Sequence, residues 1–144
     1  MNDDEILQEF GSLWRVILEP NNKIKLIEEF PRVEKLSSME IKIIEIVYSK
    51  EDVIFKEICS ILDIPKSTLT SAIDRLERLN YVTRVISKRD RRSYGLILTD
   101  EGYEVQSEYL AFEKKLSGYI LSGLDTDEER EMLLELLRKI ANNI

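Results

Sequence analysis

The side chains that could do chemistry in this sequence are short hydroxyls and cations, gathered between residues 66 and 92. The chain has no histidine and a single cysteine, so Ser-His and Cys-His nucleophilic machinery is excluded. One cysteine with carboxylates also makes a poor transition-metal site. Hydroxyls and cations suit hydrogen bonds and charge pairs with a polynucleotide. We therefore expect no enzyme, no cofactor and no metal, and these residues favour a nucleic-acid surface.

The hydroxyl-rich segment is predicted to be a helix from about Pro65 to Asn80. Its apolar residues recur at helical spacing and mark one buried stripe, namely Leu69, Ala72, Ile73, Leu76 and Leu79. The opposite face carries the candidate contacts to base edges or phosphates, Lys66, Ser67, Thr68, Thr70, Ser71 and Arg75. The alternatives are ordinary surface hydroxyls and, for Arg75, a surface ion pair.

A cationic hairpin tip is predicted directly after this helix. The β-rich runs 82–87 and 94–98 flank a charged tip formed by Lys88, Arg89, Asp90, Arg91 and Arg92. Like charges on a hairpin tip repel, and an attracted polyanion offsets that cost. Arg84, in the first of the two runs, adds to the same candidate DNA-binding surface.

The net charge of −7 is unusual for a nucleic-acid binder, so the distribution of the charge along the chain must show whether a polyanion could bind. Residues 64–95 hold eight cations against three anions, a net charge of +5, and the rest holds 13 cations against 25 anions, a net charge of −12. A polyanion responds to local potential, so a basic patch on an acidic body still indicates duplex binding. The alternative is a solvated charged surface with chance clustering.

The other elements must position this helix and hairpin. Capping-box spacing predicts helix starts at Ser37 and Thr126, each followed three residues later by a glutamate. Pro31 is expected to stop a helical piece that follows Pro20. Taken together, we expect helices at residues 4–18, 23–30, 38–49, 54–62, 65–80, 100–122 and 127–144.

The helix at residues 54–62 is expected to bury Phe55, Ile58, Cys59, Ile61 and Leu62. On this reading Cys59 is a small buried thiol that packs under Ala72, and a redox-sensing role is the less favoured alternative.

The helices at both ends of the chain are more apolar than a small domain needs for its own core. Ile6, Phe10, Leu13 and Trp14 form a broad stripe near the N-terminus, and Leu133, Leu137 and Ile140 form another near the C-terminus. These stripes predict a symmetric homodimer. The alternative is a monomer in which they pack on their own domain.

These segments resemble the multiple antibiotic resistance regulator (MarR) family of transcription factors. The most specific likeness is Asp90-Arg91-Arg92 followed by Leu98-Thr99-Asp100-Glu101-Gly102, and Asp74-Arg75-Leu76-Glu77 in the helix is nearly as telling. The sequence departs from the family at Asp63 and Asn80, where glycines are usual. Both residue types tolerate unusual dihedral angles.

The resemblance implies a mostly α fold with a small β-hairpin wing, in a single MarR-like domain spanning residues 1–144. Residues 35–99 would form the winged helix-turn-helix, and residues 1–34 and 100–144 the dimerisation helices. It implies a sequence-specific regulator, expected to be a repressor, that binds double-stranded DNA at a palindromic operator as a homodimer. Arg92 would enter the minor groove, and Asp90 would orient a wing arginine.

The family resemblance further implies release by a small aromatic or anionic effector in the crevice between the dimer helices and the winged region, with no residues assigned to it. The single cysteine and the lack of an export segment predict a cytoplasmic protein that does not associate with membranes. The competing interpretation is a winged-helix protein-interaction module that does not bind DNA.

Overall fold

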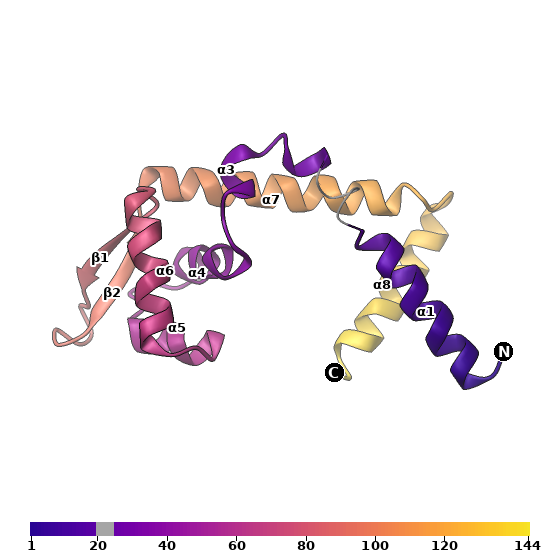
Figure 1. Ribbon diagram of the computed structural model, residues 1–144, viewed down its shortest axis with the longest axis horizontal. Helices are drawn as coiled ribbons and strands as arrows, with labels where there is room; N and C mark the ends of the chain where they lie inside the picture. Colours follow the sequence, from indigo (N-terminus) through magenta and orange to yellow (C-terminus); the bar gives the residue numbers. More distant parts are fainter. Residues whose placement is uncertain (20–24) are drawn as a thin grey trace. The chain divides into compact units, whose positions relative to one another are not determined.

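The computed structural model describes residues 1–19 and 25–144, which fall into two compact units. Residues 27–111 form one, here the winged unit, and residues 1–26 with 112–144 form the other, the terminal unit. The described elements are mostly helices with one two-stranded antiparallel sheet (Figure 1). The predicted mostly α class with a β-hairpin is confirmed.

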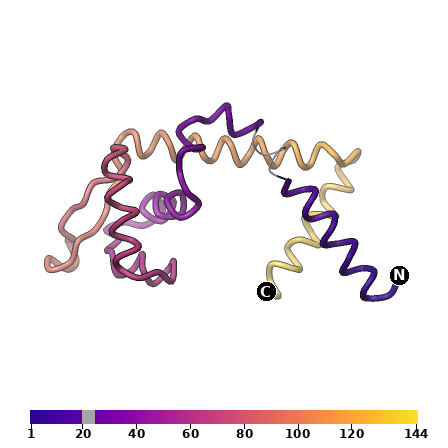
Figure 2. Tube along the Cα trace, viewed as in Figure 1, coloured from indigo at the N-terminus to yellow at the C-terminus, as the bar shows by residue number. Residues whose placement is uncertain are grey.

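The winged unit contains four helices before the hairpin. They are α3 (Pro31–Glu34), α4 (Ser38–Ser49), α5 (Phe55–Leu62) and α6 (Lys66–Arg78). The strands β1 (Val82–Ile86) and β2 (Tyr94–Leu98) follow, and α7 (Asp100–Leu121) begins here and ends in the terminal unit. In Figure 2 the trace runs from α6 directly into the hairpin.

The core of the winged unit lies where α4, α5, α6 and the hairpin meet. Its largest fully buried side chains are Ile43, Ile44, Ile58, Leu69, Ile73, Leu76 and Leu96. Full burial of one such side chain contributes about 1.5–3 kcal/mol relative to exposure. The stripe predicted for α6 is thus confirmed at Leu69, Ile73 and Leu76, and this burial turns the hydroxyl-bearing face outward.

Two left-handed residues make the turns at either end of α6 possible. Asp63, between α5 and α6, has φ 52°, and Asn80, just after α6, has φ 64°. These are the positions where the family usually has glycine, and Asp and Asn tolerate this conformation better than most residues. The departures from the family pattern therefore leave the turns intact.

The hairpin is held at its base by close backbone approaches. β1 pairs with β2 so that Val82 lies opposite Leu98 and Ile86 opposite Tyr94. A Cβ on Gly102, in the first turn of α7, would lie 2.1 Å from the Tyr81 carbonyl oxygen. Only glycine permits this contact, which explains the glycine that ends the Leu98–Gly102 motif.

The structure differs from the sequence-based expectation at Pro31, at residues 23–30 and in the burial of α5. Pro31 was expected to stop a helix but begins α3, where its missing N–H costs nothing because first-turn amides lack helical partners. The expected helix at residues 23–30 lies partly outside the described residues, and residues 25–27 are helical. In α5 only Ile58 is buried, and Ile61 is exposed because it lies about a quarter turn from the row of Ile58 and Leu62.

The terminal unit contains α1 (Asp3–Ile17), the end of α7, and α8 (Asp127–Ala141). The capping box predicted at Thr126 is confirmed, as is the one at Ser37. Neither α1 nor α8 buries a residue. Among the described residues, no helix is both long and apolar enough to span a membrane.

Candidate nucleic-acid interface

The outward face of α6 carries the predicted hydroxyls. Lys66, Ser67, Thr68 and Ser71 are exposed, and Thr70 is half-buried. Thr70 donates its hydroxyl hydrogen to the Lys66 carbonyl oxygen, 2.8 Å away. The Thr70 oxygen therefore remains available mainly as an acceptor. The hydroxyls of Ser67, Thr68 and Ser71 have no hydrogen-bond partner among the described residues, so they can donate or accept.

The tip of the wing is ordered around Asp90. The Arg92 N–H donates to Asp90 Oδ1 at 3.1 Å, and the Ser93 hydroxyl donates to Oδ2 at 2.9 Å. These hydrogen bonds to the charged form hold the pKa of Asp90 below its ordinary value. The Arg92 guanidinium lies 3.7 Å from Asp90 and is 95% exposed. Asp90 thus bonds to the backbone of Arg92, and the two side chains form only a long ion pair.

Arg75 is joined to a buried glutamate on α4. Its Nη1 donates to Glu40 Oε2 at 2.6 Å, and its Nη2 donates to the Lys35 carbonyl oxygen at 2.8 Å. Glu40 is 4% exposed and also caps α4 through the Ser37 N–H, 2.9 Å away. Burial alone would raise the pKa of Glu40, but the bonds from Ser37 and Arg75 hold it below its ordinary value. The pair fastens α6 to α4, so a phosphate would compete with Glu40 for this arginine.

Arg84 on β1 likewise has partners within the chain. Its Nε donates to Glu77 at 2.6 Å, and its Nη2 bonds Asp74, both on the second half of α6. The guanidinium carbon also lies 5.7 Å from the centre of the Phe55 ring, a cation–π distance. The sequence placed Arg84 on the DNA-binding surface, and the structure gives it two carboxylates and an aromatic face.

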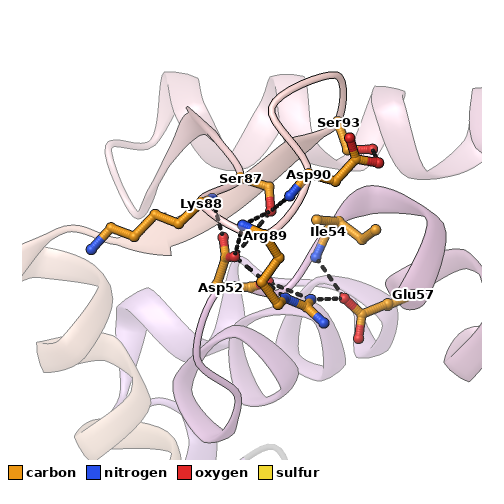
Figure 3. Close-up of polar contacts among 8 residues, drawn as sticks. All are labelled: Asp52, Ile54, Glu57, Ser87, Lys88, Arg89, Asp90 and Ser93. Atoms are coloured by element: carbon orange, nitrogen blue, oxygen red, sulfur yellow. Dashed lines mark hydrogen bonds and ion pairs between the residues drawn. The ribbon is translucent and has the colours of Figure 1, made fainter.

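Arg89 lies at the base of the wing tip and contacts Asp52 and Glu57 (Figure 3). The Arg89 contact is the main reason that the pKa of Glu57 lies below its ordinary value. Partial burial would raise the pKa of Asp52, but hydrogen bonds from the Arg89 N–H and the Ser87 hydroxyl outweigh it and lower the pKa. Arg89 therefore does not fit the expectation that the cations of the tip repel one another, because Asp52 and Glu57 offset its charge locally.

These pairings divide the predicted contact residues into two groups. Arg75, Arg84 and Arg89 each contact at least one carboxylate in the chain. Within residues 1–19 and 25–144, the side chains of Lys66, Lys88 and Arg91 have no ion-pair partner, and Arg92 has only its distant contact with Asp90. The free cations therefore lie at the start of α6 and at the end of the wing.

A cavity of about 550 Å³ lies between α5, α6 and the wing. Its wall includes two aromatic rings and four cations, namely Phe55, Tyr94, Lys56, Lys66, Arg84 and Arg92. The two ring centres are 6.3 Å apart. Cys59 also lines this cavity and is only half-buried, so the expectation of a buried thiol is wrong. Cys59 is turned toward the space between the helices and the hairpin, which the periodicity of α5 alone does not define.

Several of these residues were not among the contact residues predicted from the sequence. Asp52, Glu57 and Glu40 hold the arginines, and Phe55, Lys56 and Tyr94 line the cavity. Asp52 is separated by more than thirty positions from Arg89. No local spacing could join them. The capping role of Glu40 was visible from Ser37, but its partner on α6 was not.

Comparisons with known proteins agree with this geometry. Residues 35–93 match the sequence profile of the MarR family. The HTH-type transcriptional regulator PecS of Dickeya dadantii (strain 3937) is 34% identical over 88 residues, 61% of this chain and 52% of PecS. The uncharacterised HTH-type transcriptional regulator YpoP of Bacillus subtilis (strain 168) is 30% identical over 109 residues, 74% of this chain and 75% of YpoP.

The HTH-type transcriptional repressor MdtR of Bacillus subtilis (strain 168) is 36% identical over 85 residues, 59% of this chain and 54% of MdtR. The chain thus spans about half the length of PecS and MdtR. The crystal structure of YusO from Bacillus subtilis superposes with a TM-score of 0.81 at 24% identity, covering 100% of both chains. Streptococcus pneumoniae FabT in complex with DNA gives a TM-score of 0.72 at 24% identity, covering 98% of this chain and 96% of FabT.

The two structural likenesses establish the fold, and with the exposed face of α6 and the hairpin they define a winged helix-turn-helix protein. The match to YpoP and the match to the family profile identify the family to which this winged helix-turn-helix protein belongs. The chain belongs to the MarR family. PecS, YpoP and MdtR are transcriptional regulators and not enzymes, in agreement with the expectation from the missing histidines.

Proposed function

We propose that this protein is a sequence-specific regulator that represses transcription by binding double-stranded DNA at a palindromic operator. One observation carries the proposal: a solvent-facing row of hydroxyls and Lys66 on α6 lies beside a wing whose Arg91 and Arg92 are exposed. In such an arrangement the helix enters the major groove while the wing reaches the adjacent backbone or minor groove. The name of MdtR, a transcriptional repressor, supports the direction of control.

We further propose that the regulator acts as a homodimer. Support comes from the terminal unit, where α1 and α8 bury none of their apolar side chains. A second copy of this chain would cover both stripes by a symmetric contact. Two recognition helices would then read half-sites one helical turn apart, about 34–36 Å. The cytoplasmic location suggested by the single cysteine stays a prediction.

The test is binding to duplexes selected from a random pool, measured over a range of salt concentrations. We expect two inverted half-sites about ten base pairs apart and a steep decrease of affinity with salt. The Arg92→Ala variant should bind more weakly, with the salt slope reduced by about 0.9, or should lose its preference for narrow A·T grooves. Arg138→Ala removes the same charge from α8, outside the winged unit, and should change neither.

Equal binding by Arg92→Ala and wild type at moderate salt would show the wing assignment to be wrong. A purified protein that ignores every duplex even in dilute buffer would favour the other candidate, a winged-helix protein-interaction module. The salt slope separates these two because only phosphate neutralisation releases counterions in proportion to the contacts made.

The cavity beside α6 supports the proposal of a small-molecule effector. Its two aromatic rings and its cations Lys56, Lys66 and Arg92, which unlike Arg84 do not pair with two carboxylates, suit a small aromatic anion. Its volume of about 550 Å³ lies in the range of ligand pockets. Such a ligand would contact Lys66 and Arg92, which are also proposed to bind DNA, so ligand and DNA would compete for them. This location, inside the winged unit, differs from the inter-helix crevice that the family resemblance implied. Salicylate as a probe should weaken duplex binding in wild type, and it should have a smaller effect in Tyr94→Ala.

A further inference from the structure

The wing is fastened at its base by one carboxylate. Asp52, just before α5, has the left-handed φ of 47°. Its Oδ2 accepts from the Ser87 hydroxyl at 2.9 Å and from the Arg89 N–H at 3.0 Å, and its Oδ1 accepts from the Lys88 N–H at 3.2 Å (Figure 3). Three consecutive residues of the wing therefore bond to a single side chain from another part of the chain.

The Arg89 guanidinium completes this cluster. Its Nη2 donates to the Asp52 carbonyl oxygen at 2.7 Å and also contacts Glu57 Oε1, while its Nε lies 3.3 Å from Asp52 Oδ2. Glu57 in turn accepts from the Ile54 N–H at 3.3 Å, at the start of α5. Two carboxylates face one guanidinium, so this part of the wing has no surplus positive charge to attract a phosphate.

A second, independent contact ties the same segment to the hairpin. The Leu96 N–H donates to the Val53 carbonyl oxygen at 3.2 Å, and Ile54 forms a β-bridge with Gly95. A Cβ on Gly95 would lie 2.7 Å from that Val53 oxygen, so the approach requires glycine. The segment 52–54 thus packs along β2 and also bonds to residues 87–89, which fixes the hairpin at two places.

The cations beyond the cluster differ from Arg89. Arg92 is 95% exposed, and Figure 3 shows the Lys88 side chain pointing away from the carboxylates. Ser87 is buried, and its oxygen accepts from the N–H groups of Arg89 and Asp90, both at 3.2 Å. The backbone that leads to Arg91 and Arg92 is therefore set by the bonds below it.

We propose that Asp52, Glu57 and Arg89 form a clamp that positions the wing for DNA, and that Arg89 is a positioning residue and not a phosphate contact. This inference rests on the proposed function. It assigns to Arg89 a role different from that of its neighbours Arg91 and Arg92, which the sequence cannot distinguish. The clamp reduces the conformational freedom that the wing would otherwise lose on binding.

The experiment compares Arg89→Gln with the matched variant Arg91→Gln in full-length protein. Arg89→Gln should weaken duplex binding while leaving the salt slope as in wild type, and Arg91→Gln should lower the slope by about 0.9. Hydrogen exchange of the free protein supplies a readout that needs no DNA. The amides of Lys88 and Arg89 should exchange about tenfold faster or more in Arg89→Gln and in Asp52→Asn, and at the wild-type rate in Arg91→Gln.

Asn tolerates the left-handed conformation at position 52, and Glu57→Gln supplies a milder second variant outside the wing. A slope reduced by about 0.9 in Arg89→Gln together with unchanged wing exchange would overturn the inference. If the wild type binds no duplex at all, the proposed function fails, and the exchange rates alone still support or overturn the clamp.

Discussion

The helices α6 and α1 carry similar apolar stripes, but the stripe of α6 is buried and the stripe of α1 is exposed. In α6 the side chains Leu69, Ile73 and Leu76 have no exposed surface, because α4, α5 and the hairpin cover them. In α1 no residue is buried, and Phe10 and Trp14 stack on one another with their ring centres 6.0 Å apart while both stay exposed. Periodicity thus identifies an apolar face but not what covers it.

The same contrast separates the winged unit from the ends of the chain. The winged unit buries apolar side chains in a core of its own, and its cations Lys66, Arg91 and Arg92 are exposed. The terminal unit leaves large apolar side chains exposed along α8 as well, including Leu136, Leu137 and Ile140. A monomeric soluble protein rarely exposes contiguous apolar surface of this kind. The comparison therefore predicts that one region folds by itself and that the other needs a second copy.

The largest expected effect is on assembly. Trp14→Glu should raise the dissociation constant of the dimer by about 100-fold or more, because a symmetric interface buries the new charge twice. Sedimentation at micromolar concentration measures it. Ile86→Glu, at an exposed apolar position on β1, serves as the control and should leave the dimer intact. If the wild-type protein is a monomer at this concentration, the proposed homodimer is wrong.

The next effect concerns stability and its dependence on concentration. Ile73→Ala should lower the free energy of unfolding by about 3 kcal/mol, because it leaves a cavity in a closed core. The loss should be the same at every protein concentration. Leu137→Ala should instead cause a loss that varies with concentration, as expected for a side chain covered only in the dimer. Chemical denaturation at two concentrations checks both, and identical behaviour of the two variants would contradict the contrast between the units.

A smaller effect is expected from the pair that fastens α6 to α4. Glu40→Gln should lower the free energy of unfolding by about 2 kcal/mol, since it removes the buried carboxylate that pairs with Arg75. The Arg75 side chain is partly exposed, which limits the loss. Glu45→Gln on the exposed side of α4 is the matched control, with little expected change. Equal stability of the two variants would mean that the Glu40–Arg75 pair does not hold the helices together.

The smallest effect is the response of the wing to acid. Asp52 and Glu57 have pKa values below their ordinary values, so their contacts stabilise the fold above the ordinary pKa range, near pH 4. The contribution should disappear as the pH falls through the depressed values. Carboxyl titration by NMR should show each group titrating below its ordinary pKa, with faster wing-amide exchange in the same pH range. Ordinary titration of both groups would mean that the clamp is not formed in solution.

The sequence determined the helices, the hairpin and the face of α6 turned to solvent, because these follow from local periodicity and from residues such as Ser37, Asn80 and Gly102. It also located the basic patch, since charge density along the chain is a property of the sequence. Burial at α5 was less predictable, because a helix of only two turns is covered on one narrow side, as the exposed Ile61 shows.

Only the tertiary structure decided which cations are free. Arg89 and Arg91 are two positions apart and chemically identical, yet Arg89 contacts Asp52 and Glu57 while the described residues provide Arg91 with no carboxylate. The tertiary structure likewise pairs Arg75 with Glu40. It also places Cys59 in the wall of a cavity and not in the core. The physical reason is that ion pairs and cavities depend on distances between segments far apart along the chain, which local spacing does not contain.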